Sequence, residues 1–127
     1  MVFQERTYSV LIVTASDSFT EKIMPLLPVT DYWPVTTAHS NSEARRRIVE
    51  TAFDIVLINA PLPDDFGMRL AIDICTGSGA GVLLMVRSDQ FDDIYARVVG
   101  YGVLTLSRPT SVQMVAQNLR ILCATRE

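Results

Sequence analysis

The sequence has little of what several functional classes require. Its 127 residues include two cysteines, Cys75 and Cys123, in the pattern of neither a disulfide framework nor a zinc site. The sole histidine, His39, precedes a helix cap and is expected at the surface. No apolar run approaches the roughly 18 residues that span a membrane, and the first residues lack the regions of a secretory signal. These features predict a cytoplasmic protein with reduced thiols and no membrane contact.

An excess of positive charge is also missing. The chain has 11 Lys and Arg against 14 Asp and Glu, a net charge of −3. A domain that binds nucleic acid by itself usually carries a basic face. The one basic run, Arg45-Arg46-Arg47, spreads around a helix and is expected to be solvated surface. We therefore expect no DNA contact by this domain.

What the sequence does contain is a regular alternation of strand-like and helix-like segments. Five short apolar runs, bounded by turn residues, predict buried strands at 8–13, 33–37, 55–58, 82–86 and 103–106. Pro34 places the second strand at an edge, because proline cannot donate to an interior ladder. The alternation predicts one α/β domain over 1–127, with a parallel, doubly wound sheet and helices on both faces.

Five helices are expected at 18–27, 40–51, 66–75, 90–99 and from 112 toward 127. Ser18 and Ser40 each begin a capping box, Asp89 is expected to cap the fourth helix, and Ser111 with Thr110 the fifth. Apolar residues expected to face the core include Val49 and Val112. The glycine-rich stretch 77–81 precedes a strand, unlike a dinucleotide-binding loop, so we expect a plain connection and no enzyme.

The third strand ends at Asn59, which is followed by a proline-rich loop, two acids and a glycine. Ligands bind at the carboxyl ends of strands in parallel sheets, so Asn59 marks a candidate site. The stretch from Asp54 to Gly67, together with Ser107-Arg-Pro109, resembles the receiver domain of bacterial two-component response regulators. This resemblance implies a flavodoxin-like (CheY-like) three-layer fold of five βα units, strand order 2-1-3-4-5, and a role in phosphorelay signal transduction.

The resemblance also implies a role for six positions. A working receiver uses an aspartate nucleophile, an acidic pair that holds Mg²⁺, a switch hydroxyl, a switch aromatic and a lysine. The matching positions in this chain are Asn59 for the phosphoacceptor, Thr14 and Ala15 for the acidic pair, Val86 and Thr105 (or Leu104) for the switch residues, and Arg108 for the lysine. A neutral amide cannot replace the carboxylate nucleophile. We therefore predict a pseudo-receiver without aspartate phosphorylation, cofactor or metal.

Three acids and one serine near these positions leave alternatives open. Asp17, Asp64 and Asp65 are expected either to cap helices and solvate loops, or to form with Ser88 a residual ion pocket. Arg108 either pairs with Asp64 or Asp65 across that pocket or points outward.

A narrower resemblance concerns the output. Segments 8–13, 61–67 and 101–111, with Met114-Val-Ala-Gln, look like the N-terminal domains of ANTAR-type transcription antitermination regulators, in which a coiled coil and an RNA-binding helical domain follow. The last residues, to Glu127, lack a helix stop, which predicts either a continuing chain or a frayed end. RNA contact is expected only through that further domain.

Two functional hypotheses follow. The first is a regulatory domain that acts by protein contact or self-association through the helix 90–99, the strand 103–106 and the last helix. Its candidate contact residues are Tyr95, Tyr101, Met114 and Ile121. The alternative is a stand-alone adaptor or small-anion sensor. Its candidate ligand residues are Thr14, Ser16, Asn59, Ser88 and Arg108.

Overall fold

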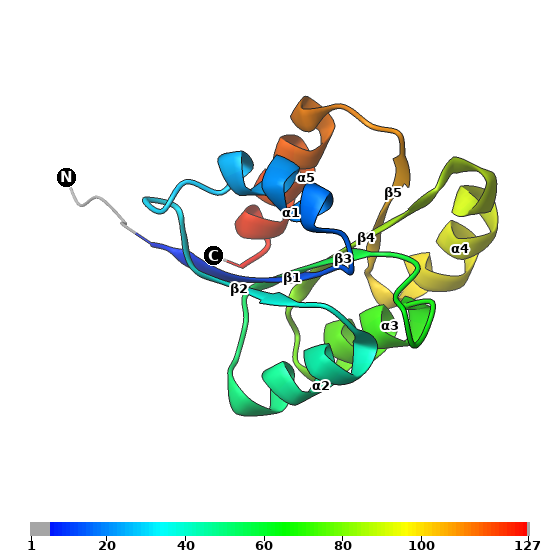
Figure 1. The fold of residues 1–127 in the computed structure, drawn as a ribbon, viewed down its shortest axis with the longest axis horizontal. Helices are drawn as coiled ribbons and strands as arrows, with labels where there is room; N and C mark the ends of the chain where they lie inside the picture. Colours follow the sequence, from blue (N-terminus) through cyan, green and yellow to red (C-terminus); the bar gives the residue numbers. More distant parts are fainter. Residues whose placement is uncertain (1–5, 127) are drawn as a thin grey trace.

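Five parallel strands form one sheet in the order β2-β1-β3-β4-β5, as seen in the computed structural model, which describes residues 6–126 (Figure 1). The strands are β1 (Tyr8–Val13), β2 (Tyr32–Ala38), β3 (Ile55–Asn59), β4 (Gly81–Arg87) and β5 (Leu104–Arg108). This is the flavodoxin-like, CheY-like arrangement expected from the sequence, and the predicted order 2-1-3-4-5 is confirmed.

The helices cover both faces of the sheet. They are α1 (Asp17–Ile23), α2 (Asn41–Glu50), α3 (Met68–Gly77), α4 (Phe91–Val98) and α5 (Val112–Ala124), with 3₁₀ turns η1 (Met24–Leu26), η2 (Ser88–Gln90) and η3 (Val99–Tyr101). In Figure 1, α1 and α5 lie on one face and α2, α3 and α4 on the other. Within residues 6–126, no helix is both long and apolar enough to cross a membrane.

The side chains of each strand point alternately to the two faces of the sheet, so the core has two parts. In β1, Val10 and Ile12 enter the apolar cluster beneath α1 and α5, whereas Leu11 and Val13 enter the cluster beneath α2, α3 and α4. All four are fully buried, because successive side chains of a strand point to opposite faces and both faces are covered. The inner strands therefore read as continuous apolar runs.

The edge position of β2 is confirmed. Tyr8 pairs with Tyr32 and Val10 with Val35, so two residues of β2, Trp33 and Pro34, stand opposite one residue of β1. The irregularity falls where proline has no N–H to donate, which an edge strand tolerates.

Two of the helix caps expected from the sequence are wrong, those at Ser18 and Asp89. Ser40 and Ser111 accept hydrogen bonds from the backbone N–H three residues later, as predicted. The cap of α1 is Ser16, which accepts from Phe19 N at 3.2 Å, so Ser18 belongs to the first turn. Asp89 makes no cap bond and instead accepts from Arg87 Nε at 3.1 Å.

Other helix boundaries also differ by a few residues from those expected. Helix α3 begins at Met68 because Gly67 takes a left-handed conformation with φ of 115°. Helix α5 ends at Ala124, and Glu127 lies outside the described residues. Val49 is 88% exposed and Val112 is 53% exposed, so both fall off the apolar faces to which the helical spacing assigned them.

Candidate functional site

The carboxyl ends of four strands meet at one edge of the sheet. Thr14 follows β1, and Asn59, Arg87 and Arg108 are the last residues of β3, β4 and β5. Asn59 pairs with Met85 and Arg87 pairs with Arg108 across the ladders, which places all of them on one face of the sheet. Met85 belongs to the cluster beneath α1 and α5, so the site opens on that side.

A chain of hydrogen bonds joins these strand ends. Arg108 donates through Nη1 to Asn59 Oδ1 and, at 3.3 Å, to the Met85 carbonyl. Asn59 Nδ2 donates to Thr14 Oγ1 at 3.1 Å, and the Ser16 backbone N–H donates to the same hydroxyl at 3.1 Å. The amide suits this place because it accepts on one side and donates on the other, which an ionised carboxylate cannot do.

Thr14 is the buried residue at the centre of this series of hydrogen bonds. It is 2% exposed, and within residues 6–126 it is the one polar residue in the buried class. A buried hydroxyl is tolerated when its hydrogen bonds are made. Because Ser16 also caps α1, the chain runs from the end of β5 through β3 to the start of α1.

Two arginines, Arg87 and Arg108, bring positive charge to the site. No carboxylate within residues 6–126 forms an ion pair with Arg108. Arg87 is paired with Asp89. Burial, and then the positive charge of Arg87, lower the pKa of the Arg108 guanidinium, which stays protonated at neutral pH. An anion is therefore favoured here, and the neutral oxygens of Thr14 and Asn59 beside a cation do not fit Mg²⁺.

Asp64, in the loop after β3, makes its hydrogen bonds with the start of α2. Its carboxylate accepts hydrogen bonds from the backbone N–H groups of Asn41 at 2.8 Å and Ser42 at 3.0 Å. These two bonds lower the pKa of Asp64. The expectation that acids cap helices holds for Asp64, although the helix is α2 and not the following one.

Asp65 and Asp17 are also engaged elsewhere. Asp65 Oδ2 accepts from the Gly67 backbone N–H at 3.3 Å, within its own loop. Asp17 is exposed in the first turn of α1, with Oδ1 4.0 Å from His39 Nε2. The expected pairing of Arg108 with Asp64 or Asp65 is therefore corrected: Arg108 turns inward to Asn59. Within residues 6–126, no group of three His, Cys, Asp or Glu side chains is placed to hold a metal ion.

Val86 and Thr105, the two positions expected to match the switch residues, lie on the other face of the sheet. Val86 is fully buried in the cluster beneath α2, α3 and α4, and Thr105 pairs with Leu84 of that cluster. The Thr105 hydroxyl is buried without a hydrogen-bond partner in the described chain. Neither side chain reaches the polar chain at Asn59.

Ala15 and Ser88 are exposed at the rim of the site. Arg87, the last residue of β4, lies on the same face of the sheet as Asn59, and the sequence analysis missed it. Its signal was its place as the first charged residue after the apolar run 82–86. The Met85 carbonyl was missed as well, because a backbone acceptor leaves no mark in a sequence.

Comparisons with known proteins give matches to solved structures. No family model matches the chain, and no curated protein matches it. A two-component response regulator from Clostridium difficile has a TM-score of 0.80 and 17% identity, over 94% of this chain and 97% of that one. Chemotaxis response regulator CheY4 of Vibrio cholerae has a TM-score of 0.78 and 18% identity, over 92% and 99%. The beryllofluoride-activated NtrC4 receiver domain dimer has a TM-score of 0.81 and 21% identity, over 94% and 98%. At these identities, the likeness establishes the fold alone.

Proposed function

We propose that this chain, which has the fold of response-regulator receiver domains, is a signal-transduction domain that works without aspartate phosphorylation. The observation that carries the proposal is the hydrogen-bond chain from Arg108 through Asn59 to Thr14. A neutral amide stands where the resemblance implies the phosphoryl-accepting carboxylate, and it already engages the cation that would meet the phosphoryl oxygens.

The chemistry of phosphoryl transfer argues for this proposal. The step needs an oxygen nucleophile and a counter-charge for the phosphoryl oxygens. The Asn59 amide carries no negative charge, and Thr14 Oγ1 already accepts two hydrogen bonds. Ala15 offers no side-chain ligand. Neither position of the acidic pair that would hold a hard cation therefore carries a carboxylate.

The same chain of bonds supports a constitutive state. It joins the ends of β3 and β5 to the start of α1 without any added group. Because these bonds need no phosphoryl group, we propose that concentration or partner binding, and not phosphorylation, sets the output.

The output surface that we propose is formed by α4, β5 and α5. Large apolar residues are exposed along these elements and the η3 turn: Tyr95, Val99, Tyr101, Met114 and Ile121. One similar structure is described as a receiver domain dimer. We propose self-association or partner docking through this face, with control of an attached RNA-binding antiterminator output, the ANTAR type that segments 101–111 resemble.

The test is phosphorylation by acetyl phosphate with Mg²⁺, read by intact mass. We expect no gain of a phosphoryl group and no stabilisation by beryllofluoride. The Asn59→Asp variant alone is also expected to stay unmodified, because Thr14 and Ala15 still hold no metal. A receiver with its aspartate and acidic pair intact serves as the positive control. A hydroxylamine-sensitive phosphoryl adduct on the wild-type chain would contradict the proposal.

A second candidate function is anion sensing at the same strand ends. It is favoured by the half-buried Arg108, which pairs with no carboxylate in residues 6–126. Calorimetry with phosphate, sulfate and nucleotides tests it, with Arg108→Gln as the matched variant. Saturable heat that the variant loses would support sensing, and absence of heat with all three would end this candidate.

A further inference from the structure

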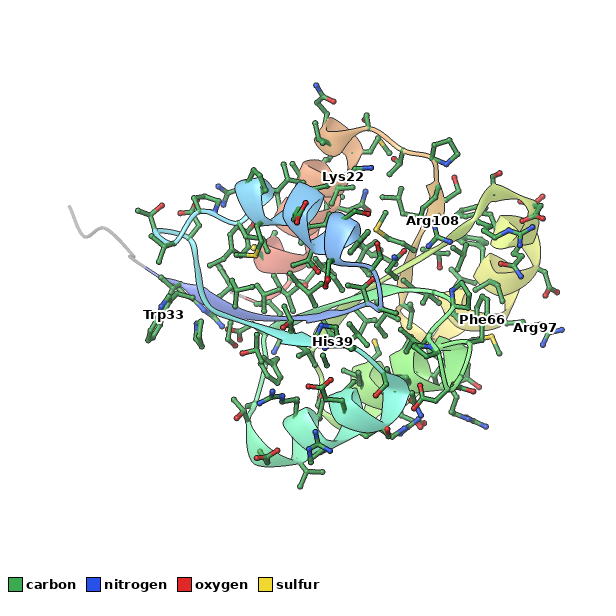
Figure 2. The ribbon with its side chains drawn as sticks, viewed as in Figure 1. Lys22, Trp33, His39, Phe66, Arg97 and Arg108 are labelled. Atoms are coloured by element: carbon green, nitrogen blue, oxygen red, sulfur yellow. The ribbon has the colours of Figure 1, made fainter. Side chains whose placement is uncertain are left out.

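A groove lies between α1 and α5, beside the connection from β5 to α5. Its volume is about 220 Å³. Its apolar walls come from Phe19 and Leu26 on the α1 side and from Val112 and Val115 on α5. Figure 2 shows Lys22 on α1 and Arg108 at the end of β5, both on the face of the sheet that α1 and α5 cover. The groove therefore combines apolar walls with two positively charged residues.

The charge of the groove has one sign. Lys22 and Arg108 are its two charged lining residues, and no acid lines it. Lys22, the only lysine of the sequence, makes no ion pair with any residue from 6 to 126. The hydrogen bonds of Arg108 within these residues all come from Nη1, which leaves its other N–H groups for a further acceptor. Two lining cations without a lining acid favour an anionic group in the groove.

We propose that the groove binds a small organic anion, a carboxylate that carries a short aliphatic chain. The carboxylate lies between Lys22 and Arg108, and the chain lies along Phe19, Leu26 and Val115. The size is suitable, because an apolar cavity of about 150 Å³ already accepts benzene. An inorganic anion would leave the apolar walls uncovered, and a neutral or cationic amphiphile would leave both cations unpaired.

The groove is linked to the hydrogen-bond chain through Arg108. One side of this guanidinium holds Asn59, and the residue also lines the groove. An anion bound in the groove would therefore contact the same guanidinium that holds Asn59 at the end of β3. Binding in the groove could in this way signal to the strand ends without a phosphoryl group. The binding site itself does not rest on the proposed function, since it requires only the groove and its two cations.

The test is a titration of the whole chain with octanoate, followed by ¹H–¹⁵N NMR and calorimetry. Saturable shifts are expected at α1, α5 and the 108–112 connection. Affinity is expected to rise about fourfold for each methylene added from butyrate upward until the groove is filled. Octanol and octylammonium are the probes that separate charge from apolar contact, and both are expected to bind at least tenfold more weakly.

Three variants complete the test. Lys22→Glu is expected to weaken octanoate binding at least tenfold. Val112→Asp, at an exposed position on the groove wall, is expected to do the same without unfolding the protein. Arg97→Glu removes an exposed cation on α4 and is expected to bind as the wild type does.

Equal binding of octanol, shifts elsewhere, non-saturable shifts or an unchanged Lys22→Glu affinity would overturn the groove proposal. None of these results changes the outcome expected with acetyl phosphate. The groove proposal can therefore be wrong while the proposed function holds, and the reverse.

Discussion

Thr14 shows at the scale of one residue how the candidate site is held. Its hydroxyl is almost completely buried, yet it accepts from the Ser16 backbone and from the Asn59 amide. Removing a buried acceptor costs more than a hydrogen bond contributes, because its donors are left without partners. The residue types at Thr14 and Asn59 were readable from the sequence, but the bond between them was not.

Thr14→Val is the substitution that measures this arrangement. Valine keeps the shape of threonine and removes the acceptor, so we expect a loss of about 1–3 kcal/mol in the free energy of unfolding. Urea denaturation measures it. Thr37→Val, on the edge strand β2 and without a side-chain hydrogen bond among the described contacts, is the control and should stay within about 0.5 kcal/mol. Equal losses in both variants would show that Thr14 contributes no special contact.

At the scale of elements, the first turn of α1 identifies the cap that the sequence pattern misplaced. Two serines, Ser16 and Ser18, stand near the start of α1, and the capping-box spacing selected Ser18 because Glu21 follows it. The structure selects Ser16, since the turn held by Thr14 starts the helix earlier. The local pattern was correct that a serine caps this helix and wrong about which one.

The pair Ser16→Ala and Ser18→Ala distinguishes the two caps. We expect Ser16→Ala to lower the free energy of unfolding by about 1 kcal/mol, because the Phe19 N–H loses its acceptor. Ser18→Ala should cost clearly less. A larger effect at Ser18 than at Ser16 would restore the cap that the sequence pattern favoured.

Helix α2 is held at its N-terminus by two carboxylates with depressed pKa values. Asp64 accepts from the Asn41 and Ser42 N–H groups, and Glu43 accepts from the His39 N–H. The pKa of each carboxylate is lowered, chiefly by these backbone bonds. A carboxylate whose pKa is lower in the folded protein stabilises it above the unfolded pKa, about 4. That stabilisation is lost as the pH falls through the folded value.

Asp64→Asn tests this pH dependence. At pH 7 the variant should unfold at a lower urea concentration than the wild type, because an amide oxygen is a weaker cap acceptor than a carboxylate. Below the folded pKa both side chains are neutral, and the difference should disappear. Asp92→Asn, on the surface of α4 and without a side-chain cap bond in the described structure, is the control. A difference that persists unchanged in acid would contradict the capping role.

At the scale of the whole molecule, exposed aromatic residues lie at both ends of the sheet. Tyr95 on α4 is 45% exposed and stacks on Phe91, with ring centroids 5.7 Å apart. Trp33, on the opposite edge strand β2, is 61% exposed. Exposure alone does not decide which edge forms an interface, but the α4 side also carries the exposed apolar residues of η3 and α5 that we propose for self-association.

Tyr95→Asp and Trp33→Asp form a matched pair for this question. We expect Tyr95→Asp to raise the dimer dissociation constant at least about tenfold, as charge insertion at a buried aromatic contact does, while Trp33→Asp leaves it unchanged. Sedimentation velocity over a concentration series measures both. A wild-type chain that stays monomeric at every concentration, or a larger effect of Trp33→Asp, would count against the α4-β5-α5 surface.

The sequence by itself determined the alternation of strands and helices, the edge place of the strand with Pro34, and the polar end of the third strand at Asn59. These features depend on residue type and on neighbours a few positions away, which periodicity and capping preferences record. The tertiary structure alone decided the partners at the site. Asp64 reaches Asn41 over 23 positions, Asn59 reaches Thr14 over 45, and Arg108 reaches Asn59 over 49. Such contacts depend on strand order and register. The sequence alone therefore could not predict the place of Arg87 at the site, the inward turn of Arg108 or the groove that Lys22 lines.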